Sequence, residues 1–155
     1  RREAIVTSNR SFIIYHVVFT TADRVSWLNS HVRPQLFAYI GGITRRLGGD
    51  LIAAGGIADH GHLMPRLPPT MPISTYVGKV KGASSAWLKA TYPSLWDFHW
   101  QQGYFATSVS PSSIAAVQAY IDNQEVHHLR QGTEEEIVAL EEKIASGMAR
   151  LTAKA

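Results

Sequence analysis

The sequence predicts an α+β domain of the ferredoxin-like (RRM-like) type, in which an antiparallel four-stranded sheet carries helices on one face. Segments with strand composition alternate with segments of helical periodicity, and their order is β-α-β-β-α-β. The size agrees, because 155 residues of which 45% are hydrophobic suffice for one domain with a substantial core. We expect that domain at residues 1–128, followed by a helical tail at residues 129–155.

The predicted strands are rich in β-branched and aromatic residues and are bounded by turn residues. The first reads SFIIYHVVFTT. The second and third are joined by a tight turn near Ala58 and Asp59, and Pro68 and Pro69 end the third. The four strands are expected at residues 11–21, 50–57, 61–67 and 100–109.

The predicted helices combine apolar residues at helical spacing with recognisable ends. Gly48 follows the first helix, Pro72 precedes the second, and Pro111 lies at the start of the third. A polar last helix begins near Thr133 with three glutamates, which suit the dipole of a first turn. The helices are expected at residues 30–47, 73–91 and 112–128 and from residue 133 onward. The third of them carries Tyr120.

Composition excludes several classes of protein. The formal charge of +3 and pI near 9.3 permit a nucleic-acid partner without requiring one. The absence of cysteine excludes disulfides and thiolate metal sites, so a metal would have to be held by imidazole or oxygen groups, as Mg²⁺, Mn²⁺ or Zn²⁺ are. No apolar run approaches the ~20 residues of a membrane span, and no signal pattern opens the sequence. We therefore expect a cytoplasmic protein.

The histidine pair His60 and His62 is the first candidate site. Alternate side chains of a strand share a face, so the two imidazoles are expected side by side. Such a pair can bind one divalent metal ion with a third ligand from elsewhere, although in an isolated His-x-His one of the two is more often a surface or hydrogen-bonded core histidine. Asp59 could orient one imidazole, and a turn aspartate explains it equally well.

Tyr120 and Gln124 are the second candidate site. They are four residues apart on the third predicted helix and so share one face. A tyrosine hydroxyl is a possible nucleophile, and an amide oxygen is a possible metal ligand. Packing of the tyrosine ring is the commoner explanation, so this spacing is weak by itself. His127 is a possible spare ligand, and His127 and His128 together suit the dipole at a helix end.

Five segments in sequence order, taken together, carry a resemblance. They read YHVVF at 15–19, DHGHL at 59–63, KGASS at 81–85, WQQGY at 100–104 and YIDNQ at 120–124. With these segments the chain resembles, over residues 12–128, the single-tyrosine HUH transposases of small bacterial insertion sequences, whose relatives include the REP-associated tyrosine transposases.

The resemblance implies a mechanism and partners. His60, His62 and Gln124 would hold one Mg²⁺ or Mn²⁺, and Tyr120 would attack a phosphate of single-stranded DNA to give a 5′-phosphotyrosine link and a free 3′-hydroxyl. The family further implies a homodimer with shared active sites, in which the tyrosine-bearing helix of one subunit can complete the other's site. The implied substrate is a DNA hairpin at the end of the element.

Arg66, Lys79 and Lys81 are candidate contacts to DNA phosphates, since cations around a DNA-binding face commonly play that role. For each of the three residues, a solvated position with no role in binding is an equally good explanation.

Gly61 and Pro65 depart from the family pattern. The residue between the two histidines is normally bulky and apolar and should face the helices, so a glycine there should remove packing. Pro65 cannot donate a ladder hydrogen bond and should lie at an edge or a bulge. Three functions stay open. The Tyr120 and Gln124 pairing favours a transposase, the two departures favour a non-catalytic single-strand-binding protein derived from one, and a metal-dependent phosphodiesterase using water is the third.

Overall fold

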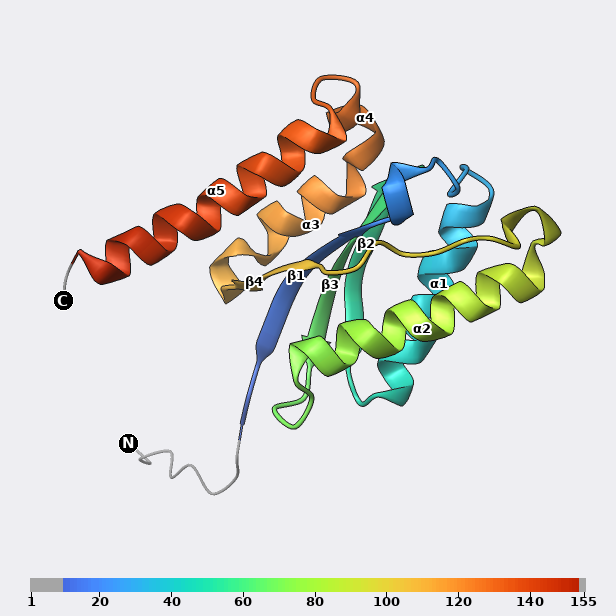
Figure 1. Ribbon diagram of the computed structural model, residues 1–155. Helices are drawn as coiled ribbons and strands as arrows, with labels where there is room; N and C mark the ends of the chain where they lie inside the picture. The colour runs from blue at the N-terminus through green and yellow to red at the C-terminus, as the bar shows by residue number, and fades with distance from the viewer. Residues whose placement is uncertain (1–9, 154–155) are drawn as a thin grey trace.

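The computed structural model describes residues 10–153 and has one antiparallel sheet with helices on both faces (Figure 1). The strand order is β2-β3-β1-β4, which confirms the ferredoxin-like sheet. The strands are β1 (Ile13–Thr20), β2 (Asp50–Ile57), β3 (His60–Leu67) and β4 (Phe105–Val109). No helix among the described residues is long and apolar enough to cross a membrane.

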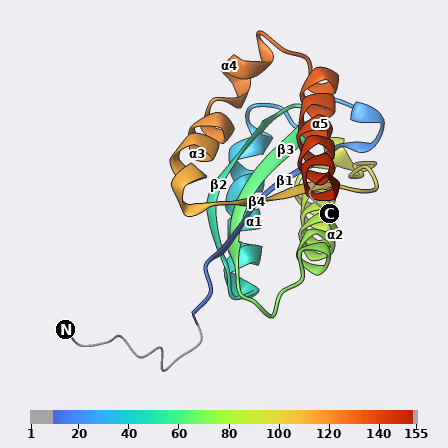
Figure 2. The same ribbon diagram turned by 90° about the vertical axis from the view of Figure 1, so that its left-hand side faces the viewer.

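The helices divide between the two faces of the sheet (Figure 2). Helices α1 (Val32–Arg46) and α2 (Ile73–Thr91) cover one face, and the other carries α3 (Ile114–Asp122), α4 (Gln124–His128) and α5 (Thr133–Thr152). Short 3-10 helices lie at Ala22–Arg24, Pro93–Leu95 and Pro111–Ser113. In Figure 1, α5 extends past the edge of the sheet, as its polar sequence allows.

Two predicted elements are shorter than the sequence suggested. The third predicted helix breaks at Asn123, whose φ and ψ are −101° and 21° and whose side chain donates to the Ala119 carbonyl, in competition with the helix backbone. The fourth predicted strand begins only at Phe105, because the positive φ of 88° at Gly103 interrupts the extended backbone before it. Trp100 keeps an isolated bridge to Thr21.

Alternation along the strands separates a large core from the histidine face. Val17, Phe19 and Leu63 pack against α1 and α2 in the main core. A smaller cluster containing Ile14 and Met64 lies under α3 on the other face. The period of two also sends His16, His60 and His62 toward α3, α4 and α5.

Gly55 lets α3 approach the sheet beside the histidines. A Cβ there would lie well inside van der Waals contact with the Ile121 carbonyl oxygen, so only glycine permits this spacing. Gly55 also pairs with His62 across the β2–β3 ladder. The close approach therefore places the neighbours of Ile121, which include Tyr120, over the histidine pair.

Pro65 and Gly61 are both accommodated locally. Pro65 lies opposite a register shift of β2 between Leu51 and Ala53, and a bulge is where a strand tolerates proline. Gly61 points toward α1, as expected, and the ring of Phe37 occupies the space beside it: an added Cβ would lie 3.4 Å from Phe37 Cε1. An aromatic side chain from the helix thus fills the volume that a bulky strand residue would take.

This packing predicts opposite effects for two substitutions at Gly61. Gly61→Ala should stabilise the fold by about 0.5–1 kcal/mol, because alanine fits beside Phe37 and orders the strand. Gly61→Leu should destabilise it by about 1–3 kcal/mol, because the Phe37 ring must move. Urea unfolding measures both, and Gly61→Leu combined with Phe37→Ala should recover part of the loss. A leucine variant more stable than the natural chain would contradict the packing.

Candidate active site

The site is built on the first residues of β3 and on the adjoining strand β1. His60 and His62 are fully buried, and their ring centroids are 5.1 Å apart. His16 of β1 stacks on His62 at a centroid distance of 5.2 Å. Three imidazoles from two neighbouring strands therefore gather on the face that α3, α4 and α5 cover.

Hydrogen bonds at Nδ1 orient the histidine pair. His60 Nδ1 lies 2.7 Å from Asp59 Oδ1, and His62 Nδ1 lies 2.9 Å from His16 Nε2. Burial, together with the neighbouring His62, lowers the pKa of His16 to about 4, so His16 is neutral at neutral pH and its Nε2 can accept. With Nδ1 of His62 protonated, its Nε2 presents a lone pair to the space under α5, and the contact of His60 Nδ1 with Asp59 turns the Nε2 of His60 toward the same space.

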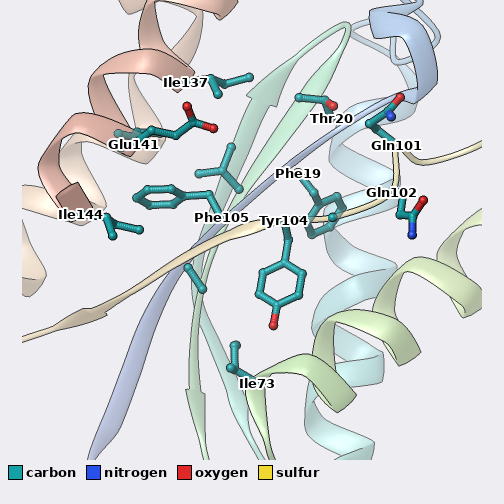
Figure 3. Close-up of a pocket in the computed structure, with 14 residues that line it drawn as sticks. Phe19, Thr20, Ile73, Gln101, Gln102, Tyr104, Phe105, Ile137, Glu141 and Ile144 are labelled. Carbon is teal, nitrogen blue, oxygen red and sulfur yellow. The ribbon is translucent and has the colours of Figure 1, made fainter. Parts of the chain in front are cut away.

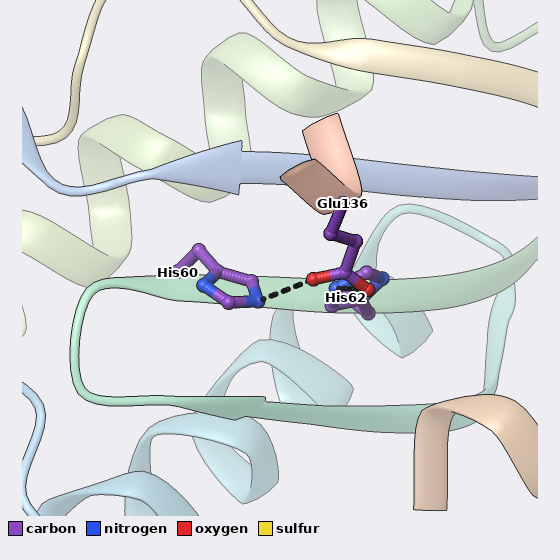
Figure 4. Close-up of side chains that lie close together, drawn as sticks. All are labelled: His60, His62 and Glu136. Carbon is purple, nitrogen blue, oxygen red and sulfur yellow. Dashed lines mark ion pairs between the residues drawn. The ribbon is translucent and has the colours of Figure 1, made fainter. Parts of the chain in front are cut away.

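Glu136 of α5 enters that space from above (Figure 4). Its buried carboxylate places Oε2 3.3 Å from His60 Nε2 and Oε1 3.4 Å from His62 Nε2. The ligand atoms of His60, His62 and Glu136 all lie within 4.8 Å of one another. This buried group could hold a metal ion, as the histidine pair alone suggested.

Tyr120 and Gln124 meet the same carboxylate. The Tyr120 hydroxyl donates to Glu136 Oε1, and the Gln124 amide nitrogen lies 3.3 Å from that oxygen. Gln124 Oε1 is 3.4 Å from His60 Nε2. The break at Asn123 preserves their common face, because Gln124 Nε2 still donates to the Tyr120 carbonyl. The structure thus brings together the four residues singled out from the sequence for catalysis and metal binding.

Charges in the site are tightly coupled. Burial opposes ionisation of Glu136, but the adjacent imidazoles of His60 and His62 outweigh it and hold the pKa of the carboxyl far below its usual range. Burial likewise opposes protonation of His60, but the hydrogen bond to Asp59 and the adjacent Glu136 carboxylate raise its pKa to about 9. Burial and the adjacent carboxylate raise the pKa of Tyr120. The tyrosine is therefore a neutral hydroxyl beside a charged acceptor.

Sequence reasoning missed Glu136 and the inward position of His128. In the sequence, the helix dipole explains this glutamate along with its neighbours Glu134 and Glu135. The signal that distinguishes Glu136 is its spacing from Leu140, the other buried side chain of α5. Residues four apart share one face of a helix, so Glu136 lies on the inward face. His128 Nε2 lies 2.7 Å from Glu136 Oε2 and 3.1 Å from His60 Nε2.

The predicted DNA-contacting residues lie away from this site. Arg66, six residues along β3 from His60, pairs with Asp50 of β2, with 2.8 Å between Nε and Oδ2. Lys81 of α2 donates to the carbonyls of Gln101, at 2.7 Å, and Gly103. Lys79 is exposed on the same helix, which covers the face opposite the histidines. These three cations are not brought together with the buried cluster.

A pocket of about 760 Å³ lies beside the cluster, between β4, the segment before it and α5 (Figure 3). Phe105 and Ile144 form apolar walls, while Gln101, Gln102 and Glu141 contribute polar groups. Tyr104, 41% exposed, points into it. An open pocket with an accessible aromatic ring thus adjoins the buried histidine site.

The known proteins that this chain resembles in sequence include two transposases. The chain is 29% identical over 115 residues to the ISDra2 transposase TnpA of Deinococcus radiodurans, with 71% of this chain and 82% of that protein covered. It is 29% identical over 119 residues to the transposase for insertion sequence element IS200 of Salmonella typhimurium, covering 71% and 75%.

Two solved structures are similar. A candidate transposase from Deinococcus radiodurans R1 superposes with a TM-score of 0.62 and 25% identity, covering 79% of this chain and 98% of that one. A REP-associated tyrosine transposase bound to a REP hairpin gives a TM-score of 0.55 over 83% and 75% of the two chains; at 14% identity it supports the fold alone.

A sequence profile of the family described as "Transposase IS200 like" matches residues 9–124. Because this match spans most of the 155 residues, the resemblance noted in the sequence is confirmed: the chain belongs to the IS200-like transposase family.

Proposed function

We propose that this member of the family cleaves and rejoins single-stranded DNA through a covalent link between Tyr120 and a DNA phosphate, with a divalent metal ion, Mg²⁺ or Mn²⁺. The observation that carries the proposal is the convergence of the Tyr120 hydroxyl, Gln124 and the Nε2 atoms of His60 and His62 on the single carboxylate of Glu136. The hydroxyl, amide and imidazole groups surround the two oxygens of one carboxylate. A site with these groups suits a phosphate and a cation.

His60, His62 and Gln124 would hold the ion, and the buried Nε2 of His62, which has no hydrogen-bond partner among the described residues, fits that use. When bound, the ion would offset charge on the scissile phosphate and orient it. Asp59 and His16 would keep the two imidazoles in the tautomer that presents Nε2.

Tyr120 would act as the nucleophile. Its Oη would form a bond to phosphorus while the bond to the 3′ oxygen breaks, and the departing 3′ oxygen would take a proton from water, leaving a 5′-phosphotyrosine and a 3′-hydroxyl. The raised pKa means that Tyr120 arrives protonated, so its proton must go to a base as attack proceeds. Glu136 Oε1 accepts the Tyr120 hydrogen bond and orients the hydroxyl, and because the pKa of Glu136 is far below its usual range, the proton would pass on to water.

Partners are proposed from the relatives. The REP-associated neighbour is bound to a REP hairpin, and we propose a hairpin-bearing single strand as the substrate here. A homodimer with shared active sites belongs to the same proposal. Within one chain, Tyr120 and Gln124 reach the histidine pair of that same chain, so a dimer that exchanges these helices would first have to release this contact.

The decisive test removes only the nucleophilic oxygen. Purified protein is mixed with Mn²⁺ or Mg²⁺ and labelled single-stranded DNA from the ends of its own genomic element. The natural chain should form an adduct that survives denaturing electrophoresis, and Tyr120→Phe should abolish it while leaving DNA binding intact. Tyr104→Phe is a matched control, because it removes an exposed hydroxyl away from the cluster.

The alternatives predict other results. A phosphodiesterase that uses water would cleave the DNA equally well with Tyr120→Phe. A non-catalytic binding protein would retain the strand in a salt-sensitive manner and form no adduct with any metal. Tyr104, an exposed aromatic residue that lines the pocket, is a candidate for stacking on a base under each of these functions.

Metal removal should separate chemistry from binding. Treatment with EDTA should abolish the adduct, and added Mn²⁺ should restore it, because the phosphate charge is otherwise uncompensated. His62→Gln should lower adduct formation by at least ~100-fold, in line with the loss of a positioned electrostatic group, with DNA binding little changed. Full adduct formation by the EDTA-treated protein or by His62→Gln would show that the metal is not part of the mechanism.

Lys79 offers a test of the DNA-binding surface. Lys79→Ala should weaken single-strand binding uniformly across sequences and reduce the slope of log K against log salt by about 0.7, the release expected for one phosphate contact. Lys89→Ala on the same helix is the comparison. An equal change in both variants would indicate general electrostatic attraction, and no change in either would place the DNA elsewhere.

A further inference from the structure

We propose that His128 and Glu136 are two additional metal ligands, so that this site binds a divalent transition-metal ion such as Mn²⁺, Co²⁺ or Zn²⁺ in preference to Mg²⁺. The inference rests on the proposed function in one respect, namely that the ion sits at His60 and His62. It adds ligands from the chain after residue 124, where the match to the family ends.

His128 is held over the histidine pair by the short helix α4. It lies one helical turn after Gln124, and its Nε2 is 3.2 Å from Gln124 Oε1. The same nitrogen is 3.1 Å from His60 Nε2. Two imidazole nitrogens at this separation, both beside an amide oxygen and a carboxylate, point to one common centre.

Glu136 is fixed over the same centre by the start of α5. Thr133 Oγ1 donates to Asp59 Oδ1 at 3.2 Å, and that aspartate oxygen also contacts His60. One turn later Glu136 projects inward, and Leu140 buries the next turn. The aspartate that orients a candidate ligand therefore also anchors the helix that supplies another.

Three buried atoms in or beside the cluster lack hydrogen bonds among residues 10–153. Two are His62 Nε2 and Glu136 Oε2, on side chains that are 0% and 3% exposed, and the third is His127 Nε2, which lies 3.8 Å from Glu136 Oε1. Burying polar atoms without partners costs free energy. His62 Nε2 lies 3.4 Å from Glu136 Oε1 without making a hydrogen bond, and an ion bound to His62 Nε2 and to the Glu136 carboxylate would give both groups a partner.

The separations are those of a coordination sphere. Ligands bound at about 2.1 Å in a tetrahedron lie roughly 3.4 Å from one another. Glu136 Oε2 lies 3.3 Å from His60 Nε2 and 2.7 Å from His128 Nε2, and Oε1 lies 3.4 Å from His62 Nε2. The ligand atoms of His60, His62 and Glu136 already lie within 4.8 Å of one another, and His128 would complete the sphere by moving toward His62.

The donor set decides the class of metal. Mg²⁺ prefers six oxygen ligands in a strict octahedron and keeps several waters. Three imidazoles with one carboxylate instead suit first-row transition metals, whose affinity for nitrogen ligands is higher. The histidine pair with Gln124 leaves the choice between Mg²⁺ and Mn²⁺ open, whereas His128 and Glu136 favour Mn²⁺ and its heavier neighbours.

Co²⁺ is the probe, because its visible absorption reports ligands directly and without DNA or catalysis. The full chain, stripped of metal, should bind one Co²⁺ and develop the intense absorption of a four- or five-coordinate site. Excess Mg²⁺ should fail to displace it. His128→Gln and Glu136→Gln should each weaken Co²⁺ binding by at least ~10-fold and alter the spectrum, since loss of even an indirect partner costs that much.

Matched controls and folding checks accompany the variants. His31→Gln and Glu134→Gln change the same residue types at exposed positions and should leave the spectrum unchanged. Circular dichroism establishes that each variant is folded. Spectra and affinities unaffected by both His128→Gln and Glu136→Gln, or ready displacement of Co²⁺ by equimolar Mg²⁺, would overturn the assignment. The Tyr120 adduct assay could still succeed in that case, so the two proposals fail separately.

Discussion

The buried carboxylate of Glu136 is the contact on which the active-site face depends. It meets side chains from β3, α3 and α4, and it belongs to α5, so one charged group joins four elements. A buried charge is tolerated only when it is compensated, and removing the compensation costs several kcal/mol. The positions of α3, α4 and α5 over the sheet are therefore tied to the state of the imidazoles, whether the positive charge comes from a protonated histidine or from a metal ion.

The two faces of the sheet divide stability from chemistry. The face under α1 and α2 holds the larger apolar cluster, with fully buried residues such as Val17, Leu36 and Leu63. The opposite face has a smaller apolar cluster, and polar side chains fill the remaining space. Because non-directional apolar packing secures the sheet from one side, the other side can accept buried polar groups such as those proposed to bind a metal ion.

Much of this arrangement could be predicted from local patterns, and the part that could not be predicted depends on distant contacts. The period of two in a strand suffices to place His60 and His62 on one face, and helical spacing suffices to pair Tyr120 with Gln124. The filling of the space beside Gly61 by Phe37 could not be predicted, because it joins a strand to a helix far away in the sequence. Glu136 was hidden for a similar reason: in a run of three glutamates, only the tertiary position of α5 distinguishes the buried one.

The break at Asn123 illustrates how a local irregularity can serve the site. Sequence periodicity predicts one continuous helix through His128, yet the side chain of Asn123 bonds back to Ala119 and ends α3. The chain then restarts as α4 with a changed direction, which lets both Gln124 and His128 face His60 while Tyr120 stays over His62. A tight approach at Gly55 brings α3 down to the sheet, and the break at Asn123 redirects α4. Each feature rests on a single residue, a glycine without a side chain and an asparagine that bonds to the backbone, and together they set the distances between Tyr120 and the proposed metal ligands.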